Sequence, residues 1–289
     1  MSSWNDRRAR PNQRATASYR MRLGDNDRAI VRLVYEYRLL SQGQIQRLLG
    51  RSRSTVQRLL RRLYDHRFLE RVFLPVQTFG SSSPYYILDR QGVELLQRMD
   101  VGDLTETPSK TVSSMYIEHT TAINDFRIGM QLAVEREGWR VEQWLTEGEI
   151  KADYDRVKVP DKHRPVALVP DGYFSIGVPG KGTTHFFLEL DRGKMQLERF
   201  RQKIEAYVAY YRSGGYTRRF GAQGFRLLTV VESAGQGRVQ QLVKSTAQVP
   251  GIGRRFWFTH LEQTTTGDVL HDPIWRIAGI AEPQALFTS

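Results

Sequence analysis

Residues 41–66 read SQGQIQRLLGRSRSTVQRLLRRLYDH, and this stretch decides the fold of the N-terminal part of the chain. Ser41 and Ser52 are good helix N-caps, and Gly50 suits the position just after a helix end. The apolar residues between these signals recur at helical spacing, and they are Ile45, Leu48, Leu49, Val56, Leu59, Leu60 and Leu63. We therefore predict a short helix, a tight turn and a second helix from about Ser52 to His66, which is the order of a helix-turn-helix.

The flanking segments complete a winged form of this motif. Upstream, apolar residues at three- and four-residue steps predict a helix from Asp25 to about Leu40. Downstream, two β-type runs at 68–74 and 85–88 enclose a Gly- and Ser-rich loop, which predicts a wing. A short helix that starts at Asp89 closes the module. Residues 23–100 are therefore predicted to be a winged helix-turn-helix DNA-binding domain.

The distribution of charge supports a nucleic-acid partner for this domain. The chain has 289 residues and a formal net charge of +12. Residues 1–71 contain 17 Arg, no Lys and 6 acidic residues, whereas the rest of the chain contains 26 basic and 25 acidic residues. The basic excess is therefore local to the N-terminal part, and it predicts double-stranded DNA as the partner.

The outer face of the second helix carries the candidate DNA-binding residues. With its apolar positions turned inward, the polar residues on or beside its outer face are Arg51, Arg53, Thr55, Gln57, Arg58, Arg61 and Arg62. Arg53, Thr55 and Gln57 lie in the first turns, which enter the major groove in this motif. Arg suits guanine and Gln suits adenine, so these positions could read bases, and the remaining arginines suit phosphates. The alternative is a solvated, arginine-rich face of a protein-interaction domain.

The remaining composition limits the class of protein. Residues 1–22 are predicted to be a flexible basic arm, which either follows the DNA or remains a solvated tail. Residues 101–112 are predicted to be a linker. The chain has no Cys, which excludes disulfides and thiolate sites, and no apolar run long enough to cross a bilayer. We expect a cytoplasmic protein with no membrane partner.

The second domain, residues 113–289, is predicted to be mixed α/β. Apolar patterns indicate helices at about 115–137, 194–212 and 236–246, and strands at 139–145, 166–176, 185–191, 225–231 and 255–258. Residues 151–164 are charged and turn-like. The predicted order is α-β-β-β-α-β-α-β.

Acidic residues on two of these strands form a candidate metal site. Glu189 and Asp191 are two residues apart, so they share one face of a strand. If the strand that carries Asp171 lies alongside, the three carboxylates offer oxygen ligands suited to Mg²⁺ or Mn²⁺. Lys203 lies on the following helix. These four residues are the candidate catalytic residues, and the three acids are the candidate metal ligands.

Other interpretations of these residues remain open. Asp171 lies in a Pro-Asp-Gly sequence that is typical of a β-turn. The acids could equally form an ion-pair network with Arg192, Lys194 or Lys203. The chain lacks the His spacing of a zinc site and the full Gly-rich pattern of a phosphate-binding loop, so we expect neither zinc nor a nucleotide cofactor.

The second domain resembles the PD-(D/E)XK nuclease fold in its element order and in the acids at Asp171 and Glu189. The resemblance implies that these acids bind a metal ion and that a lysine orients or activates water. Asp191 stands where that family has its lysine. Some relatives supply the lysine from the following helix, which here is Lys203. Acids on the first helix contribute in some members, so Glu118 and Asp125 are secondary candidates.

Four blocks along the chain are similar to the replication-relaxation protein family, and they are residues 52–65, 119–127, 170–174 and 187–193. This resemblance implies a protein of plasmids or other mobile elements that acts in replication and DNA relaxation. One hypothesis is a Mg²⁺-dependent endonuclease that nicks DNA. The other is a transcriptional or replication regulator whose inactive nuclease-like domain serves for dimerisation or partner binding. Candidate partners are therefore a second copy of the chain and other replication or mobile-element proteins.

Overall fold

A computed structural model describes residues 14, 21–75, 83–101, 112–160, 162–232 and 237–288. Its architecture is mixed α/β, as predicted. The chain divides into two compact units, residues 1–124 and 125–289, and the boundary falls inside helix α5 (Ser114–Arg136). Most of the predicted arm, the predicted wing tip at 76–82 and the predicted linker at 102–111 lie outside the described residues.

Unit 1 has the element order that residues 41–66 and their flanks predict. Its elements are α1 (Asp25–Glu36), β1 (Leu40–Ser41), α2 (Gln42–Leu49), α3 (Arg53–Asp65), β2 (Leu69–Val72), β3 (Tyr85–Leu88) and α4 (Arg90–Arg98). Ser41 and Ser52 cap α2 and α3 by accepting hydrogen bonds from backbone N–H groups of Gln44 and Thr55. Gly50 ends α2 in the left-handed conformation, at φ 59°. The helix predicted to reach about Leu40 ends at Glu36, and Leu40 instead begins β1. Strand β1 was not predicted, because two residues are too few for a strand pattern.

The three strands of unit 1 form an antiparallel sheet in the order β1-β3-β2. The start of α5 packs on this sheet, where Ile117 clusters with Leu39, Val72 and Ile87. The buried Asn124 side chain donates hydrogen bonds to the carbonyls of Tyr37 and Leu39, at 3.1 and 2.6 Å. These contacts explain why the first part of α5, placed in the second domain by the sequence, belongs to unit 1.

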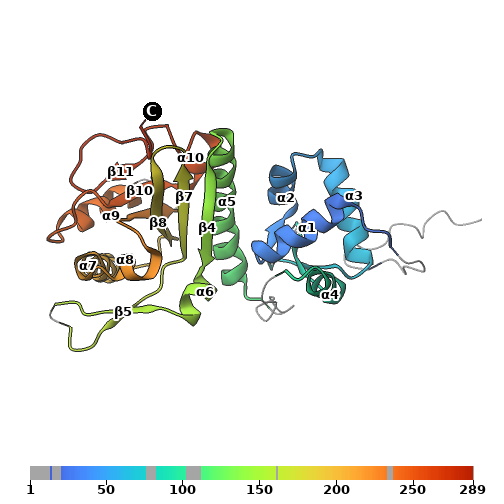
Figure 1. Ribbon diagram of the computed structural model, residues 1–289, viewed down its shortest axis with the longest axis horizontal. Helices are drawn as coiled ribbons and strands as arrows, with labels where there is room; N and C mark the ends of the chain where they lie inside the picture. The colour runs from blue at the N-terminus through green and yellow to red at the C-terminus, as the bar shows by residue number, and fades with distance from the viewer. Residues whose placement is uncertain are drawn as a thin grey trace, which may run out of the picture. The chain divides into compact units, whose positions relative to one another are not determined.

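Unit 2 is built on a six-stranded mixed sheet in the order β11-β10-β9-β8-β7-β4 (Figure 1). Its strands are β4 (Arg140–Thr146), β7 (Gly172–Val178), β8 (Gly182–Asp191), β9 (Arg226–Val231), β10 (Phe256–His260) and β11 (Arg276–Ile277). Strands β4, β7 and β8 run antiparallel in sequence order. Helices α7 (Leu197–Ser213) and α8 (Gly215–Phe220) then lead to β9, which is parallel to β8. Helix α9 (Arg238–Ala247) leads to β10, parallel to β9, and α10 (Leu261–Thr266) follows β10.

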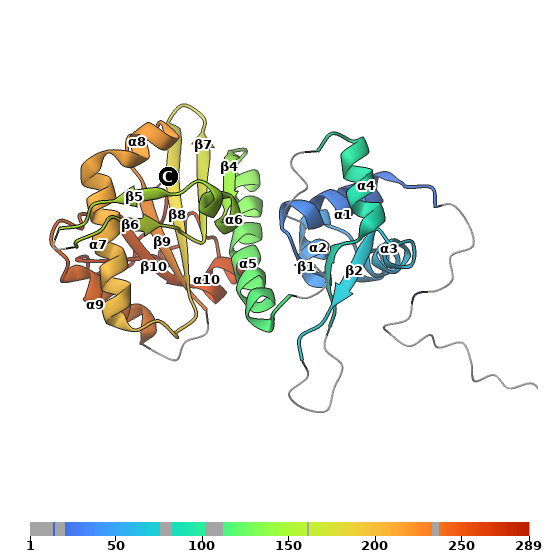
Figure 2. The same ribbon diagram turned by 90° about the horizontal axis from the view of Figure 1, so that it is seen from below.

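The sheet of unit 2 is covered on both faces. On one face Phe187 packs against Tyr207 of α7, with ring centroids 5.8 Å apart. On the other face Phe174 packs against Phe126 of α5, with centroids 6.0 Å apart. Figure 2 shows α7 and the second half of α5 on the two sides of the strands. Because successive residues of a strand point to opposite faces, Phe187, Glu189 and Asp191 of β8 all face the side of α7 and α9.

Two details of unit 2 differ from the prediction. The single strand predicted at 166–176 is two strands, since β6 (Val166–Leu168) pairs with β5 (Asp155–Val157) in a separate sheet and β7 begins at Gly172. Pro170 interrupts the run because it has no backbone N–H to donate. Residues 151–164 were predicted to be turn-like, but they contain β5 and the end of α6 (Glu147–Ala152). Within the described residues, no helix has the length and apolar character needed to cross a membrane.

Candidate functional site

Polar side chains from three elements of unit 2, and from the bend before β7, converge where β4 ends and β7 begins. Thr146, the last residue of β4, pairs with Gly172, and Gly172 in turn pairs with Leu188 of β8. Glu147, Asp171 and Glu189 are each the chain neighbour of one of these paired residues. The strand pairing therefore brings the three acids to the same region. Helix α7 crosses the same region of the sheet and supplies Lys203 and Tyr207.

Asp171 is held firmly against β8. Its backbone N–H donates to the carbonyl of Leu188 at 3.0 Å, and its Oδ2 accepts from the N–H of Leu190 at 2.7 Å. Glu147 is the first residue of α6, and one of its carboxylate oxygens lies within 4.8 Å of one from Asp171. The Pro-Asp-Gly sequence thus forms the bend before β7, and its carboxylate also lies beside a second acid. Both interpretations offered for Asp171, turn residue and ligand, agree with this geometry.

Glu189 is the buried centre of the cluster. Its side chain is only 6% exposed. Its Oε2 accepts a hydrogen bond from Lys203 Nζ, and its Oε1 accepts one from the hydroxyl of Tyr207 at 2.6 Å. Lys203 and Tyr207 are four residues apart, so they lie on the same face of α7. The predicted Glu189 and Lys203 are therefore in direct contact.

The electrostatics of the cluster follow from its burial. Burial raises the pKa of Glu189 to about 7, and the charge of Asp171 adds to this effect while Lys203 opposes it. Burial on its own would lower the pKa of Lys203, but the carboxylates of Glu189 and Asp171 raise it overall. Burial also raises the pKa of Tyr207, so its hydroxyl stays protonated and donates. Near neutral pH a cationic lysine therefore lies against a carboxyl group that is close to its own pKa.

The donor set of this cluster fits a divalent cation. Asp171 and Glu147 bring carboxylate oxygens within 4.8 Å of each other, and the charge of Asp171 also acts on Glu189. Carboxylate oxygens suit Mg²⁺ or Mn²⁺ better than a softer metal. The acids come from three different elements, so their proximity is created by the fold and not by sequence spacing. The charge of Lys203 offsets only part of their mutual repulsion, and a cation would offset the rest.

Asp191 has different partners from Glu189. Its two carboxylate oxygens accept hydrogen bonds from Arg238 of α9, at 3.1 and 2.7 Å, and Oδ1 also accepts from the N–H of Gly193. Its side chain is 3% exposed and that of Arg238 is 11% exposed. The structure thus places Asp191 in a buried ion pair that joins the end of β8 to α9. Lys194 is exposed in the loop between β8 and α7.

The predicted DNA-binding residues of unit 1 fall into an exposed first group and a half-buried second group. Arg51, Arg53, Gln57 and Arg58 are exposed. Thr55 is half-buried at the capped start of α3. Arg61 and Arg62 are half-buried and form ion pairs, the first with Asp65 at 2.8 Å and the second with the buried Asp27 of α1. Only the first group is fully available to a partner.

Sequence patterns alone did not reveal two members of the cluster. Glu147 follows directly after a strand, inside a Thr-Glu-Gly-Glu capping sequence that explains its acids as helix-start residues. Tyr207 fits the apolar stripe of α7, so its helical spacing indicates only a core residue. The signal for Glu147 was its place after a strand next to the Asp171 strand. The secondary candidates are separated: Glu118 lies in the part of α5 that belongs to unit 1, and Asp125 begins unit 2.

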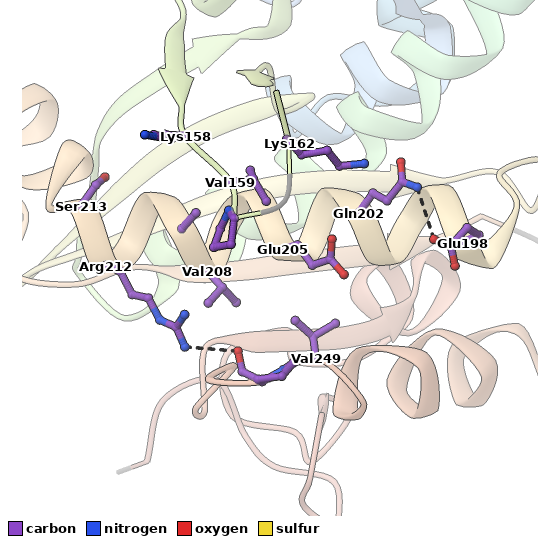
Figure 3. Close-up of a pocket in the computed structure, with 13 residues that line it drawn as sticks. Lys158, Val159, Lys162, Glu198, Gln202, Glu205, Val208, Arg212, Ser213 and Val249 are labelled. Atoms are coloured by element: carbon purple, nitrogen blue, oxygen red, sulfur yellow. Dashed lines mark hydrogen bonds between the residues drawn. The ribbon is translucent and has the colours of Figure 1, made fainter. Parts of the chain in front are cut away.

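A groove of about 800 Å³ lies along α7 (Figure 3). Glu198, Gln202, Glu205 and Arg212 line it from α7. Lys203 and Tyr207 do not line it, because they face the sheet from the opposite side of the helix. Its lining mixes acids, bases and valines, so its chemistry selects no ligand class.

Comparison with known proteins found one match. The model of a protein family described as replication-relaxation matches residues 31–224, which include most of unit 1 and the acidic cluster of unit 2. No match was found among curated proteins or among solved structures.

Proposed function

The chain belongs to the replication-relaxation family, and from that premise we propose that it is a DNA-binding protein of a plasmid or other mobile element. In this proposal unit 1 is a winged helix-turn-helix that binds double-stranded DNA. Unit 2 is a PD-(D/E)XK-like domain that nicks DNA during replication or relaxation. The protein acts in the cytoplasm, with a second copy or other replication proteins as partners.

The architecture of unit 1 supports the first half of the proposal. The order α1-β1-α2-α3-β2-β3, with β3 between β1 and β2, supports a winged helix. Helix α3 would be the recognition helix. Arg53, Gln57 and Arg58 lie on its exposed face, and Arg51 lies just before it. Exposed arginines in the first turns suit bidentate contacts to bases and phosphates.

The topology of unit 2 supports the second half. An antiparallel β4-β7-β8 meander, helix α7 and a parallel β9 follow the second part of α5, in the element order of the PD-(D/E)XK fold. The observation that carries the proposal is the Lys203–Glu189 contact beside Asp171. Through this contact helix α7 supplies a lysine to the acids. Strand β8 has Asp191 at the position where the PD-(D/E)XK family has its lysine.

The residues of the cluster have distinct roles in the proposed reaction. Asp171, Glu147 and Glu189 would hold Mg²⁺ or Mn²⁺. A divalent ion bound there would polarise the phosphodiester and stabilise the leaving oxygen. Lys203 would orient the attacking water with its remaining N–H donors, and Tyr207 would hold Glu189 through Oε1. Asp191 serves a structural role in this proposal because Arg238 holds it.

The test is a nicking assay on supercoiled plasmid with Mg²⁺ or Mn²⁺. We expect the wild type to convert plasmid to the nicked form, and Asp171→Asn, Glu189→Gln and Lys203→Met to lose this activity. Lys194→Met is the matched control, since it removes an exposed lysine that has no contact with the acids. Absence of nicking by the wild type, or equal nicking by all variants, would refute the nuclease proposal.

The second candidate function is a regulator with an inactive nuclease-like domain. One observation favours it: both carboxylate oxygens of Glu189 already accept hydrogen bonds, from Lys203 and Tyr207. In that case the cluster is a structural ion-pair network and unit 2 serves for dimerisation or partner binding. Plasmid binding without nicking, together with a dimer in sedimentation analysis, would support this function over the first.

A further inference from the structure

A second cavity of unit 2 lies at the edge of the sheet where the parallel strands β8, β9 and β10 begin. Its volume is about 630 Å³. It is distant along β8 from the acidic cluster, because His185 lines the cavity near the start of the strand whereas Glu189 lies near its end. The loops that precede β9 and β10 supply Arg226, Arg254 and Arg255.

The charge of this cavity is one-sided. No Asp or Glu lines it, and its three arginines form no ion pair with any described residue. Glu142 accepts a hydrogen bond from the lining residue Thr183 at 3.0 Å but does not itself line the cavity. Other arginines of the same unit are paired, as Arg238 is with Asp191. Three arginines without an ion-pair partner among the described residues therefore line one hollow of a unit that is otherwise nearly neutral.

Two of these arginines are held in place by aromatic rings and backbone carbonyls. Arg226 lies over the ring of Trp257, at 4.7 Å from its centroid, and donates to the carbonyl of Leu286. Arg255 lies over Tyr211, at 3.4 Å, and donates to the carbonyl of Ile252 at 2.8 Å. Each carbonyl hydrogen bond uses one of the five N–H donors of a guanidinium group, so further donors remain. The packing thus preorganises the groups without neutralising them.

Arg254 completes the set in a different way. It is exposed, and its side chain makes no hydrogen bond or ion pair within the described part of the chain. A structural role does not account for it. Planar guanidinium groups match the oxygens of a phosphate in bidentate geometry. We infer that this cavity binds a phosphate group, and that a nucleic acid strand supplies it.

This site would give unit 2 its own contact to the strand, independent of α3 and of any nicking. The experiment uses the full chain with Arg53→Ala and Arg58→Ala, so that the recognition helix contributes little to binding. Phenylglyoxal modifies accessible arginines, and mass spectrometry then maps them. The probes are a 12-nucleotide single-stranded DNA, ATP and inorganic phosphate. We expect the oligonucleotide to protect Arg254, and the exposed Arg199 to react equally with and without it.

The outcomes separate the sources of the phosphate. Protection by ATP or inorganic phosphate but not by the oligonucleotide would overturn the assignment to a nucleic acid strand. Equal modification of Arg254 with every probe would overturn the site itself. Loss of nicking in the Asp171→Asn variant bears on the proposed function alone, because that residue is remote from this cavity.

A matched pair of variants gives a second readout. In the same background, Arg254→Gln should bind the oligonucleotide about tenfold more weakly, as expected for one lost charge-assisted contact. It should also lower the slope of log affinity against log salt by about 0.7. Arg199→Gln should change neither quantity, since Arg199 lies on α7 and does not line the cavity. Equal affinity of the two variants would contradict the inference.

Discussion

Replacing Arg238 by Met should destabilise unit 2 strongly. The change removes both hydrogen bonds to the carboxylate of Asp191 and the one to the carbonyl of Met195. Met keeps a similar apolar length, so packing of the side-chain stem is largely preserved. Asp191 stays behind as a buried carboxylate with one N–H donor, from Gly193. The substitution therefore tests the loss of the charged partner of Asp191 with little change in packing.

The magnitude follows from the burial of the pair. With side-chain exposures of 3% for Asp191 and 11% for Arg238, solvent screens the charges little. Removing one partner of a buried ion pair costs about 3–5 kcal/mol. For a unit of this size each kcal/mol corresponds to roughly 2–4 °C in Tm, so we expect a fall of about 6–20 °C.

The assay is urea and thermal unfolding followed by tryptophan fluorescence. Four of the five Trp residues lie in unit 2, so this signal reports mainly on that unit. Arg199→Met is the control, because Arg199 is exposed and makes no ion pair with a described residue. Asp191→Asn and the double variant complete a double-mutant cycle. Once one partner is replaced, replacement of the other should lower the free energy of unfolding much less than the first replacement did.

A loss of stability below about 0.5 kcal/mol in Arg238→Met would refute this reasoning, because changes of that size are typical of exposed surface sites. Mg²⁺ supplies a second criterion. If Asp191 were a metal ligand, removal of its competing arginine would strengthen Mg²⁺ binding. We expect no change in Mg²⁺ affinity, measured by calorimetry.

Three further predictions concern other parts of the molecule. Arg58→Ala should lower DNA affinity, and lower the slope of log affinity against log salt by about 1, without changing stability. Arg62→Ala should instead lower the free energy of unfolding by up to about 3 kcal/mol, because the buried Asp27 loses its half-buried partner. The reverse pattern would contradict the division of these arginines. Gly50→Ala should cost roughly 1–2 kcal/mol, because φ at this helix end is 59°, and an unchanged Tm would count against the left-handed cap. Burial lowers the pKa of the His185 imidazole in the folded protein below its usual 6.5. As pH falls below 6.5, the unfolded chain binds a proton at this residue before the folded protein does, so the free energy of unfolding of the wild type falls. Wild type and His185→Gln should therefore converge in Tm between pH 7 and pH 5, and parallel curves would refute this.

Local patterns in the sequence determined the elements whose signals are short-range. The caps at Ser41 and Ser52, the left-handed Gly50 and the apolar stripe of α3 all depend on neighbours within a few residues, and the structure has them where they were predicted. The mixed α/β class and the family were predictable for the same reason, since both follow from the order of such segments. Strands of two or three residues, such as β1 and β5, carry too little pattern to be predicted.

Tertiary structure alone decided which charged residues meet. Arg61 and Arg62 look like Arg58 in the sequence, but only the fold places Asp27 beside Arg62. Asp191 and Glu189 share one strand face, yet Arg238 from a helix 47 residues away holds the first, whereas Lys203 and Tyr207 hold the second. Such partners are distant in the chain, and their interaction depends on burial and on distance in space, which residue spacing does not encode.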